Sequence, residues 1–363
     1  MTERVREALQ AGFAQGWADP HRLASEGRQA RQILDGAREA IADALGTEAS
    51  TVHFTASVHT ALERALAGMA AARRGRTSVV VSAIERDAVM HAAAWAAPSV
   101  TEVPVDTAGH VDEAALAAAV ASPETAVVAL QHANQEIGTI QRLDHLGAVV
   151  RDAGVPLLVD ASSSIGHVKA PTGWDALVAH PADWGGPAGI GVLALAPRTR
   201  WLPRWPEAPS PADEWAPGGV SVPLALAAAV ALQERGETLA RTGARLGEYV
   251  NRIRSAVATI AGVEVHGDPV ERLPHVVTFS CLYASGEELV SRLDREGFAI
   301  GSGSACVTGT LAPSRVLGAV GALTHGNVRL ALHPGVSAAD VDRFLAVLPR
   351  VVEQLRDEAG VGA

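Results

Sequence analysis

Residues 125–161 read TAVVALQHANQEIGTIQRLDHLGAVVRDAGVPLLVDA, and this stretch decides the fold. TAVVALQ (125–131) and VPLLVDA (155–161) are short, nearly continuous apolar runs, which are typical of strands buried on both faces. Between them, RLDHLGAVVRDAG (142–154) spaces its apolar residues as one face of a helix does. A strand, a helix and a second strand in this order predict a parallel sheet with helices packed on its faces.

The same alternation runs through the first two thirds of the chain. RQARQILDGAREAIADALG (28–46) has apolar residues at every fourth position, which predicts a helix with Gly46 as its C-terminal cap. SVVVSA (78–83) predicts a buried strand, and DAVMHAAAWAA (87–97) predicts a helix with Asp87 at its N-cap. The fold class is therefore α/β, and ligands of such sheets bind beyond the carboxyl ends of the strands.

The last third of the chain has a different pattern. A proline-, tryptophan- and acid-rich stretch (203–219) precedes a long helical stretch that starts at Val222. Strand-like and helical runs then alternate on a smaller scale, as in HVVTFSC (275–281). We predict two domains, a large α/β domain over residues 1–235 and a small α+β domain over residues 236–363.

Composition excludes several classes of function. The chain has 363 residues, 48% of them hydrophobic, and a net charge of -10 with no long basic cluster, which argues against nucleic-acid binding. The N-terminus is charged and helical, and the longest apolar run, near Val222, is too short to span a membrane. We expect a cytoplasmic protein with no membrane partner. Two cysteines without a CxxC motif make no disulfide framework.

Three kinds of side chain suggest chemistry. Asp160 ends a buried strand, where a carboxylate is costly unless it meets a cation or hydrogen-bond donors, so it either caps the next turn or faces a ligand. Asn134 and Gln135 follow another strand at the same edge, although strand-end loops are polar in any case. Cys306 lies among small residues in GSGSACVTGT, so it is either a reactive thiol or an inert loop residue. Cys281, inside an apolar strand, is expected to be a core residue.

Arg329 lies near the start of the apolar run NVRLALH (327–333). Its guanidinium would bind a carboxylate well, and a structural ion pair is an equally good interpretation.

Taken together, these stretches resemble the cysteine desulfurases, in the class V aminotransferase branch of the fold-type I pyridoxal-phosphate enzymes. The resemblance covers nearly the whole chain, and its motifs follow in the family's order: residues 18–39, 52–66, 132–141, 157–168, 301–317 and 327–342. It implies a mostly parallel seven-stranded sheet between helices, a smaller C-terminal α+β domain and a homodimer. It also implies that Asp160 faces the pyridine nitrogen, that Cys306 is the catalytic cysteine, and that Arg329 binds the substrate carboxylate.

The departures from the family pattern fall in the cofactor pocket. HPADWGGPAGIG (180–191) aligns so that Asp183 stands where the Schiff-base lysine should be, and His180 replaces a phosphate-contacting serine. His59 likewise replaces a phosphate-binding threonine, and Asp87 replaces the histidine that stacks on the ring. Together with Asp160, Ser163, Asn134 and Gln135, these residues make up the old and largely degenerate pocket.

An aspartate cannot form an internal aldimine, because that bond needs an amine. The only lysine in the chain, Lys169, lies in an outgoing turn nine residues after Asp160, where a solvent-facing side chain is the ordinary interpretation. We therefore expect no cofactor, or pyridoxal phosphate held only without a covalent bond.

Three functions remain open, and the sequence leaves open whether the chain is an enzyme. The first is sulfur handling through Cys306 without an internal aldimine, with a sulfur-acceptor protein as partner. The second is a pyridoxal-phosphate-dependent desulfurase or lyase that binds the cofactor non-covalently. The third is a metal site built from the histidines and aspartates of the vacated pocket, although no residue is assigned as a metal ligand.

Overall fold

The structure is a computed structural model that describes residues 1–203, 215–216, 219–302 and 313–361. The chain divides into two compact units: unit 1 comprises Met1–Val103, Asp112–His132 and Arg142–Leu239, and unit 2 comprises Pro104–Val111, Ala133–Gln141 and Ala240–Ala363. The boundary expected from the sequence lay after residue 235, and that expectation assigned both short segments of unit 2 to the large domain.

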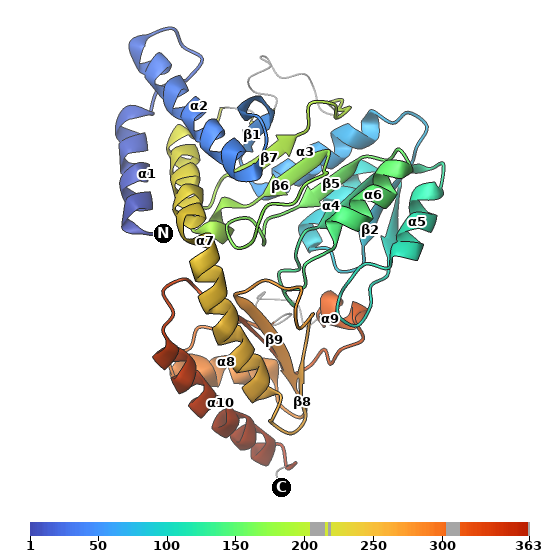
Figure 1. Ribbon diagram of the computed structural model, residues 1–363, viewed down its shortest axis with the longest axis vertical. Helices are drawn as coiled ribbons and strands as arrows, with labels where there is room; N and C mark the ends of the chain where they lie inside the picture. Colours follow the sequence, from blue (N-terminus) through green and yellow to red (C-terminus); the bar gives the residue numbers. More distant parts are fainter. Residues whose placement is uncertain (204–214, 217–218, 303–312, 362–363) are drawn as a thin grey trace. The chain divides into compact units, whose positions relative to one another are not determined.

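A seven-stranded sheet forms the centre of unit 1 (Figure 1). Its strands, in spatial order, are β1 (Val52–Thr55), β7 (Gly191–Leu195), β6 (Ala176–Ala179), β5 (Leu157–Asp160), β4 (Thr125–Gln131), β2 (Ser78–Ser82) and β3 (Ser99–Val103). All neighbouring pairs are parallel except those of β7, which runs antiparallel to both β1 and β6. The mostly parallel seven-stranded sheet predicted from the sequence is confirmed.

Helices cover both faces of this sheet. The long apolar runs make this necessary, because successive residues of a strand point to opposite faces and nearly all of them here are apolar. On one face α3 (Val58–Ala71) and α4 (Asp87–Ala96) pack together against Val79, Val81 and their neighbours. The remaining strand residues face α5 (Glu113–Ala121) and α6 (Leu143–Asp152), which pack against each other and against β3, β4 and β5.

Two local predictions can be compared directly with the structure. Helix α2 (Ser25–Leu45) ends as predicted, with Gly46 at φ 69° accepting the left-handed conformation that glycine adopts without strain. The prediction of Asp87 as the N-cap of α4 is wrong by one residue. Arg86 is the N-cap, and Asp87 is the first residue of the helix, where its carboxylate still lies near the positive end of the helix dipole.

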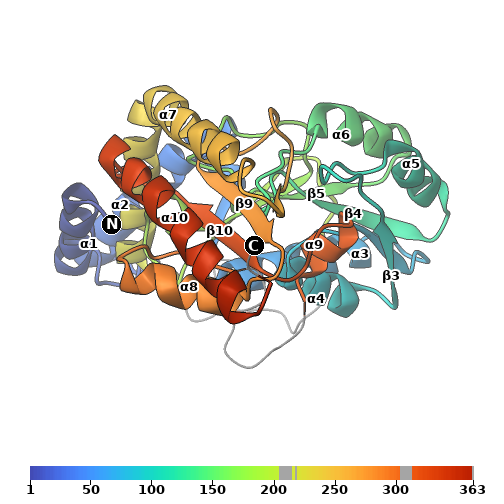
Figure 2. The same cartoon turned by 90° about the horizontal axis from the view of Figure 1, so that it is seen from below.

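Unit 2 is built on a three-stranded antiparallel sheet in the order β10 (Asn327–Ala331), β9 (Val276–Cys281) and β8 (Val263–Val265). Figure 2 looks onto its helical side, with α10 (Ala338–Glu358) and α8 (Gly286–Arg295) lying beside the strands. The apolar side chains of both helices, of β9 and β10, and of the C-terminal part of α7 (Val222–Val257) form one core. Helix α1 (Glu3–Gln15) belongs to unit 1, and the short helix α9 (Arg315–Ala319) belongs to unit 2.

The long helix predicted from Val222 is α7 (Val222–Val257), which has 36 residues. It begins in unit 1 and ends in unit 2, so the domain boundary falls inside a helix rather than in a linker. Its first half is rich in alanine, and its second half carries many charged residues. Across the described ranges of the chain, no helix has both the length and the apolar character needed to cross a membrane.

Candidate functional site

Six strands of unit 1 end at one edge of the sheet, and most of the predicted pocket residues follow them there. The carboxyl ends of β2, β3, β4, β5 and β6 lie at the same edge because these strands are parallel, and β1 joins them because two antiparallel pairings separate it from β6. Arg86 and Asp87 follow β2, while Asp160 ends β5. This is the edge at which open α/β sheets bind their ligands.

The carboxylate of Asp160 is held from two sides. Its Oδ1 atom accepts hydrogen bonds from the backbone N–H of Ser162 at 3.0 Å and from the Ser162 hydroxyl at 2.5 Å. Its Oδ2 atom lies 2.9 Å from Nε of Arg86, and the two side chains are only 3% and 14% exposed. The Arg86 contact is an ion pair without hydrogen-bond alignment, so Oδ2 is a buried oxygen with no hydrogen-bond partner among the described residues. Ser162 and Arg86 thus meet the need of a buried carboxylate for donors and a cation.

Arg86 is the residue that sequence reasoning missed. Asp87, which the resemblance placed in the ring-stacking position, is exposed at the start of α4, and the side chain before it contacts Asp160 instead. The turn that carries Arg86 is fixed by Glu85, whose Oε1 accepts the backbone N–H of Gln131 at 2.8 Å. The amide of Gln131 in turn donates to the carbonyl of Ile84 at 2.8 Å. The sequence signal that could have identified Arg86 is its position shortly after the end of a strand in a parallel sheet, the edge at which such sheets bind ligands.

His180 and Asp183 form a second pair at the end of β6. Nδ1 of His180 lies 3.3 Å from Oδ1 of Asp183, and both side chains are about one third exposed. The backbone carbonyl of Asp183 accepts a hydrogen bond from Nε2 of His167 at 2.8 Å. Burial lowers the pKa of His167, so its ring is neutral and acts here as a donor to the loop. The loop continues into Trp184, whose indole N–H donates to the carbonyl of Ala228 at 3.0 Å.

The other predicted pocket residues of unit 1 are less constrained. His59 is exposed in the first turn of α3, whose N-cap Ser57 accepts the backbone N–H of Thr60. Ser163 is half-buried in the turn after β5. The structure therefore joins Asp160 to Arg86 and His180 to Asp183, and it records no contact of His59, Asp87 or Ser163 with these pairs.

Asn134, Gln135 and Arg329 belong to unit 2. Asn134 is buried, and its side-chain oxygen accepts the backbone N–H groups of Glu136 and Ile137, so it shapes its own turn. Gln135 is half-buried. Arg329 is half-buried in β10 and exchanges backbone hydrogen bonds with Gly301 at 2.7 and 2.9 Å. Cys306 lies outside the residues that the structure describes.

Comparison with known proteins identifies the family. The model of the aminotransferase class-V family matches residues 1–206 and 221–344. The chain belongs to this family. It is 32% identical to a cysteine desulfurase of Cereibacter sphaeroides, over the whole chain and 96% of that protein. It is 30% identical to the cysteine desulfurase IscS of Methanosarcina thermophila, over 98% of the chain and 90% of that protein.

Solved structures confirm the fold. A NifS-like protein superposes with a TM-score of 0.87, at 22% identity, over 97% of this chain and 96% of its own length. The chain is thus a cysteine desulfurase-like member of its family with the fold of the fold-type I enzymes.

This finding corrects one expectation. Cysteine desulfurases depend on pyridoxal phosphate, so the expectation that the chain uses no cofactor conflicts with the family to which it belongs. The residues present fit the cofactor's ring: Oδ2 of Asp160 is a buried carboxylate oxygen without a hydrogen-bond partner among the described residues, which is what a protonated ring nitrogen needs. The unusual residues at 59, 87, 180 and 183 favoured an empty pocket, but Asp160 keeps the buried carboxylate oxygen that the ring nitrogen of the cofactor needs.

Proposed function

We propose that this protein is a sulfur-handling member of the cysteine desulfurase branch that binds pyridoxal phosphate without a covalent bond to lysine and carries sulfur on Cys306. The position of Lys169 supports the proposal that the cofactor is bound without a covalent bond. It is the only lysine of the chain, and its side chain is exposed beyond the turn that follows β5. No other side chain in the sequence can form a Schiff base.

Different residues of unit 1 would hold the ring and the phosphate of the cofactor. Asp160, whose Oδ1 is fixed by Ser162, would accept a hydrogen bond from the ring nitrogen on Oδ2, the oxygen that also faces Arg86. His59 and His180 stand where the family has phosphate-contacting hydroxyl groups, and an imidazole N–H can donate a hydrogen bond to a phosphate oxygen. The bound cofactor supplies an electron sink for an amino-acid substrate. Arg329 remains the predicted partner of the substrate carboxylate.

Sulfur reaches Cys306 by exchange with a persulfide donor. The Cys306 thiolate attacks the terminal sulfur of a donor R–S–S–H, the S–S bond of the donor breaks, and R–S⁻ leaves, so that Cys306 carries –S–SH. The step needs no oxidant, because the sulfur is transferred at the oxidation state that it has in the donor. We further propose a cytoplasmic homodimer that passes this sulfur to an acceptor protein, as the resemblance implies.

A titration of the purified full chain with pyridoxal phosphate tests the cofactor half of the proposal. We expect an absorbance change that gel filtration reverses, and no mass adduct after borohydride treatment, because borohydride fixes only a Schiff base. A borohydride-fixed adduct on Lys169 would refute the non-covalent mode. Absence of any binding would refute the cofactor assignment.

A second candidate function is catalysis of cysteine breakdown with the non-covalent cofactor. The buried Oδ2 of Asp160, which has no hydrogen-bond partner among the described residues, favours this function. A carboxylate oxygen at that place would keep the ring nitrogen of a bound cofactor protonated. The product distinguishes the two functions. Release of alanine or pyruvate from cysteine by the loaded protein identifies catalysis, whereas carriage of sulfur alone gives neither compound.

A further inference from the structure

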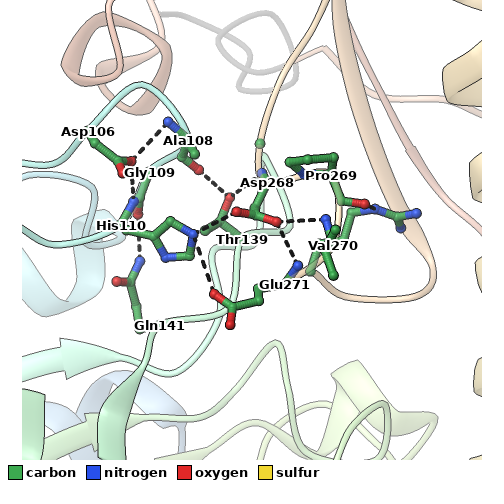
Figure 3. A network of polar contacts seen from close by, with 12 residues as sticks. Asp106, Ala108, Gly109, His110, Thr139, Gln141, Asp268, Pro269, Val270 and Glu271 are labelled. Carbon is green, nitrogen blue, oxygen red and sulfur yellow. Dashed lines mark hydrogen bonds and ion pairs between the residues drawn. The ribbon is translucent and has the colours of Figure 1, made fainter. Parts of the chain in front are cut away.

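Three potential metal ligands meet in unit 2, and none of them is among the predicted pocket residues. His110 projects from the hairpin joined by the Val105–Val111 bridge, and Asp268 and Glu271 project from the loop after β8 (Figure 3). Nε2 of His110 lies 2.9 Å from Oδ2 of Asp268 and 3.9 Å from Oε2 of Glu271. Within the part of the chain that the structure describes, this is the one group of three such ligands whose atoms all lie within 4.8 Å of one another.

The backbone around His110 is held in place independently of any ion. Oδ1 of Asp106 accepts the N–H groups of Ala108 at 2.9 Å and of His110 at 2.8 Å, which closes the turn. The amide of Gln141 then clamps this turn, because it accepts the N–H of Val111 at 3.0 Å and donates to the carbonyl of Gly109 at 2.6 Å. The imidazole is consequently presented by a rigid turn, and only about 12% of the side chain is exposed.

The loop that carries the two carboxylates is fixed in the same way. Oδ1 of Asp268 accepts the N–H groups of Val270 and Glu271, each at 2.6 Å, so its Oδ2 is directed to His110 (Figure 3). The N–H of Asp268 donates to the hydroxyl of Thr139 at 3.0 Å, and the N–H of Ile140 donates to the carbonyl of Glu271 at 2.9 Å. One oxygen of Asp268 therefore shapes the loop, and the other is left for His110 or for an ion.

The charges at the cluster suit a cation. Two carboxylates lie beside one imidazole there, and Oδ2 of Asp268 faces Nε2 of His110. Arg254 and Arg272 lie nearby and weaken the negative potential. The guanidinium groups of Arg254 and Arg272 donate hydrogen bonds to backbone carbonyls and to the side chain of Asn251.

We propose that His110, Asp268 and Glu271 bind a divalent first-row transition-metal ion, of which Zn²⁺ is the best match. An imidazole nitrogen with two carboxylate oxygens favours Zn²⁺ over Mg²⁺ or Ca²⁺, which prefer oxygen ligands only. Metal–ligand bonds of about 2.0–2.2 Å place tetrahedral ligand atoms roughly 3.3–3.6 Å apart. The separations of 2.9 and 3.9 Å from His110 to the two carboxylates lie on either side of this range, about half an ångström from its middle. Binding displaces the His110–Asp268 hydrogen bond and ties the hairpin to the loop.

The test uses the full chain after treatment with a chelator. Titration with Co²⁺, which replaces Zn²⁺ and gives visible d–d bands, is followed by competition with Zn²⁺. We expect the wild type to give these bands with one equivalent of Co²⁺ and to melt at a higher temperature with Zn²⁺. The variant Glu271→Gln removes one ligand from a side chain that is 45% exposed, and we expect at least about tenfold weaker binding.

Glu264→Gln is the matched control. Glu264 also lies near a histidine, with Oε1 4.0 Å from Nδ1 of His266, and it is 52% exposed in the same unit, but no second carboxylate joins that pair in the described residues. This variant should keep the Co²⁺ bands and the melting shift of the wild type. Equal Co²⁺ affinity in Glu271→Gln and the wild type, or no bands in either, overturns the proposal. Neither readout involves Cys306 or pyridoxal phosphate.

Discussion

Arg86 lies 2.9 Å from Asp160, and the two residues belong to the ends of two strands that do not pair with each other, β2 and β5. Strand β4 lies between them in the sheet, so the ion pair spans the end of β4. Since both side chains are largely buried, each charge depends on the other for compensation. A ring nitrogen that binds Asp160 must therefore share the carboxylate with a cation that is already there.

The first prediction concerns this ion pair. Arg86→Gln leaves the Asp160 carboxylate buried without a cation, which should lower the free energy of unfolding by about 3 kcal/mol. The double variant Arg86→Gln/Asp160→Asn removes both charges, keeps Oδ1 as an acceptor for Ser162, and should recover most of the loss. Urea unfolding at pH 7 measures both.

Arg38→Gln serves as the control for Arg86→Gln. Its partner Asp35 is 52% exposed, and exposed ion pairs contribute less than about 1 kcal/mol. If Arg86→Gln is no more destabilising than Arg38→Gln, the Arg86–Asp160 pair is not the compensated buried pair that the geometry indicates.

The second prediction restores an amine to the loop after β6. In Asp183→Lys the new side chain should form a Schiff base with pyridoxal phosphate, and borohydride should then fix a mass adduct on residue 183. The substitution removes the contact between residue 183 and His180, whose side chains are both about one third exposed. The free energy of unfolding should therefore fall by less than about 1 kcal/mol. Ala182→Lys is the control, since residue 182 is similarly half-buried and should give no adduct. Non-covalent binding with no adduct in Asp183→Lys would show that residue 183 does not face the aldehyde.

The third prediction separates the two cysteines. Burial raises the pKa of the Cys281 thiol to about 12, so at pH 8 only about one molecule in ten thousand carries the thiolate. Cys306, the proposed sulfur carrier, should react with iodoacetamide at least about tenfold faster, as measured by mass spectrometry of peptides after brief treatment. In urea, where both thiols are exposed, the rates should converge. Equal and slow labelling of both cysteines in the folded protein would remove the support for sulfur carriage.

The fourth prediction is a loss of stability in mild acid caused by His132. Burial lowers the pKa of this histidine from 6.5 to about 4, and its Nδ1 has no hydrogen-bond partner among the described residues. The unfolded chain therefore takes up a proton near pH 6.5, whereas the folded chain does so only near pH 4. The contribution of the neutral ring is complete above pH 6.5 and is lost as the pH falls toward 4, on the order of 3 kcal/mol.

Urea unfolding of His132→Gln at several pH values measures this contribution. The free energy of unfolding should depend less steeply on pH between 6.5 and 4 than in the wild type. A dependence on pH should remain, because burial also lowers the pKa of His53 to about 4. His91→Gln changes an exposed histidine on α4 and should leave the wild-type slope. An unchanged slope in His132→Gln would mean that this ring is not held neutral in the folded state.

The sheet of unit 1 could be predicted from the sequence because its strands are buried on both faces, so runs such as SVVVS and TAVVALQ are visible without any partner. The position of Asp160 followed from the same pattern. The partner of Asp160 did not follow, because β2 gives way to α4 within a few residues and a shift of one residue decides whether Arg86 or Asp87 turns to the carboxylate. His110 and Asp268 are 158 residues apart in the chain, and no local pattern connects them.

The two short segments that unit 2 takes from the first half of the chain have a consequence for synthesis. Residues 104–111 and 133–141 leave the ribosome at least a hundred residues before their partners in β9 and its preceding loop. Until then the carbonyl of Glu136 lacks the Thr278 hydroxyl, and that of Gly138 lacks the N–H of Leu273. Unit 1 can therefore assemble its sheet during translation, whereas unit 2 closes only after β9 and β10 have been synthesised. A fragment that starts at residue 240 would lack part of its own fold.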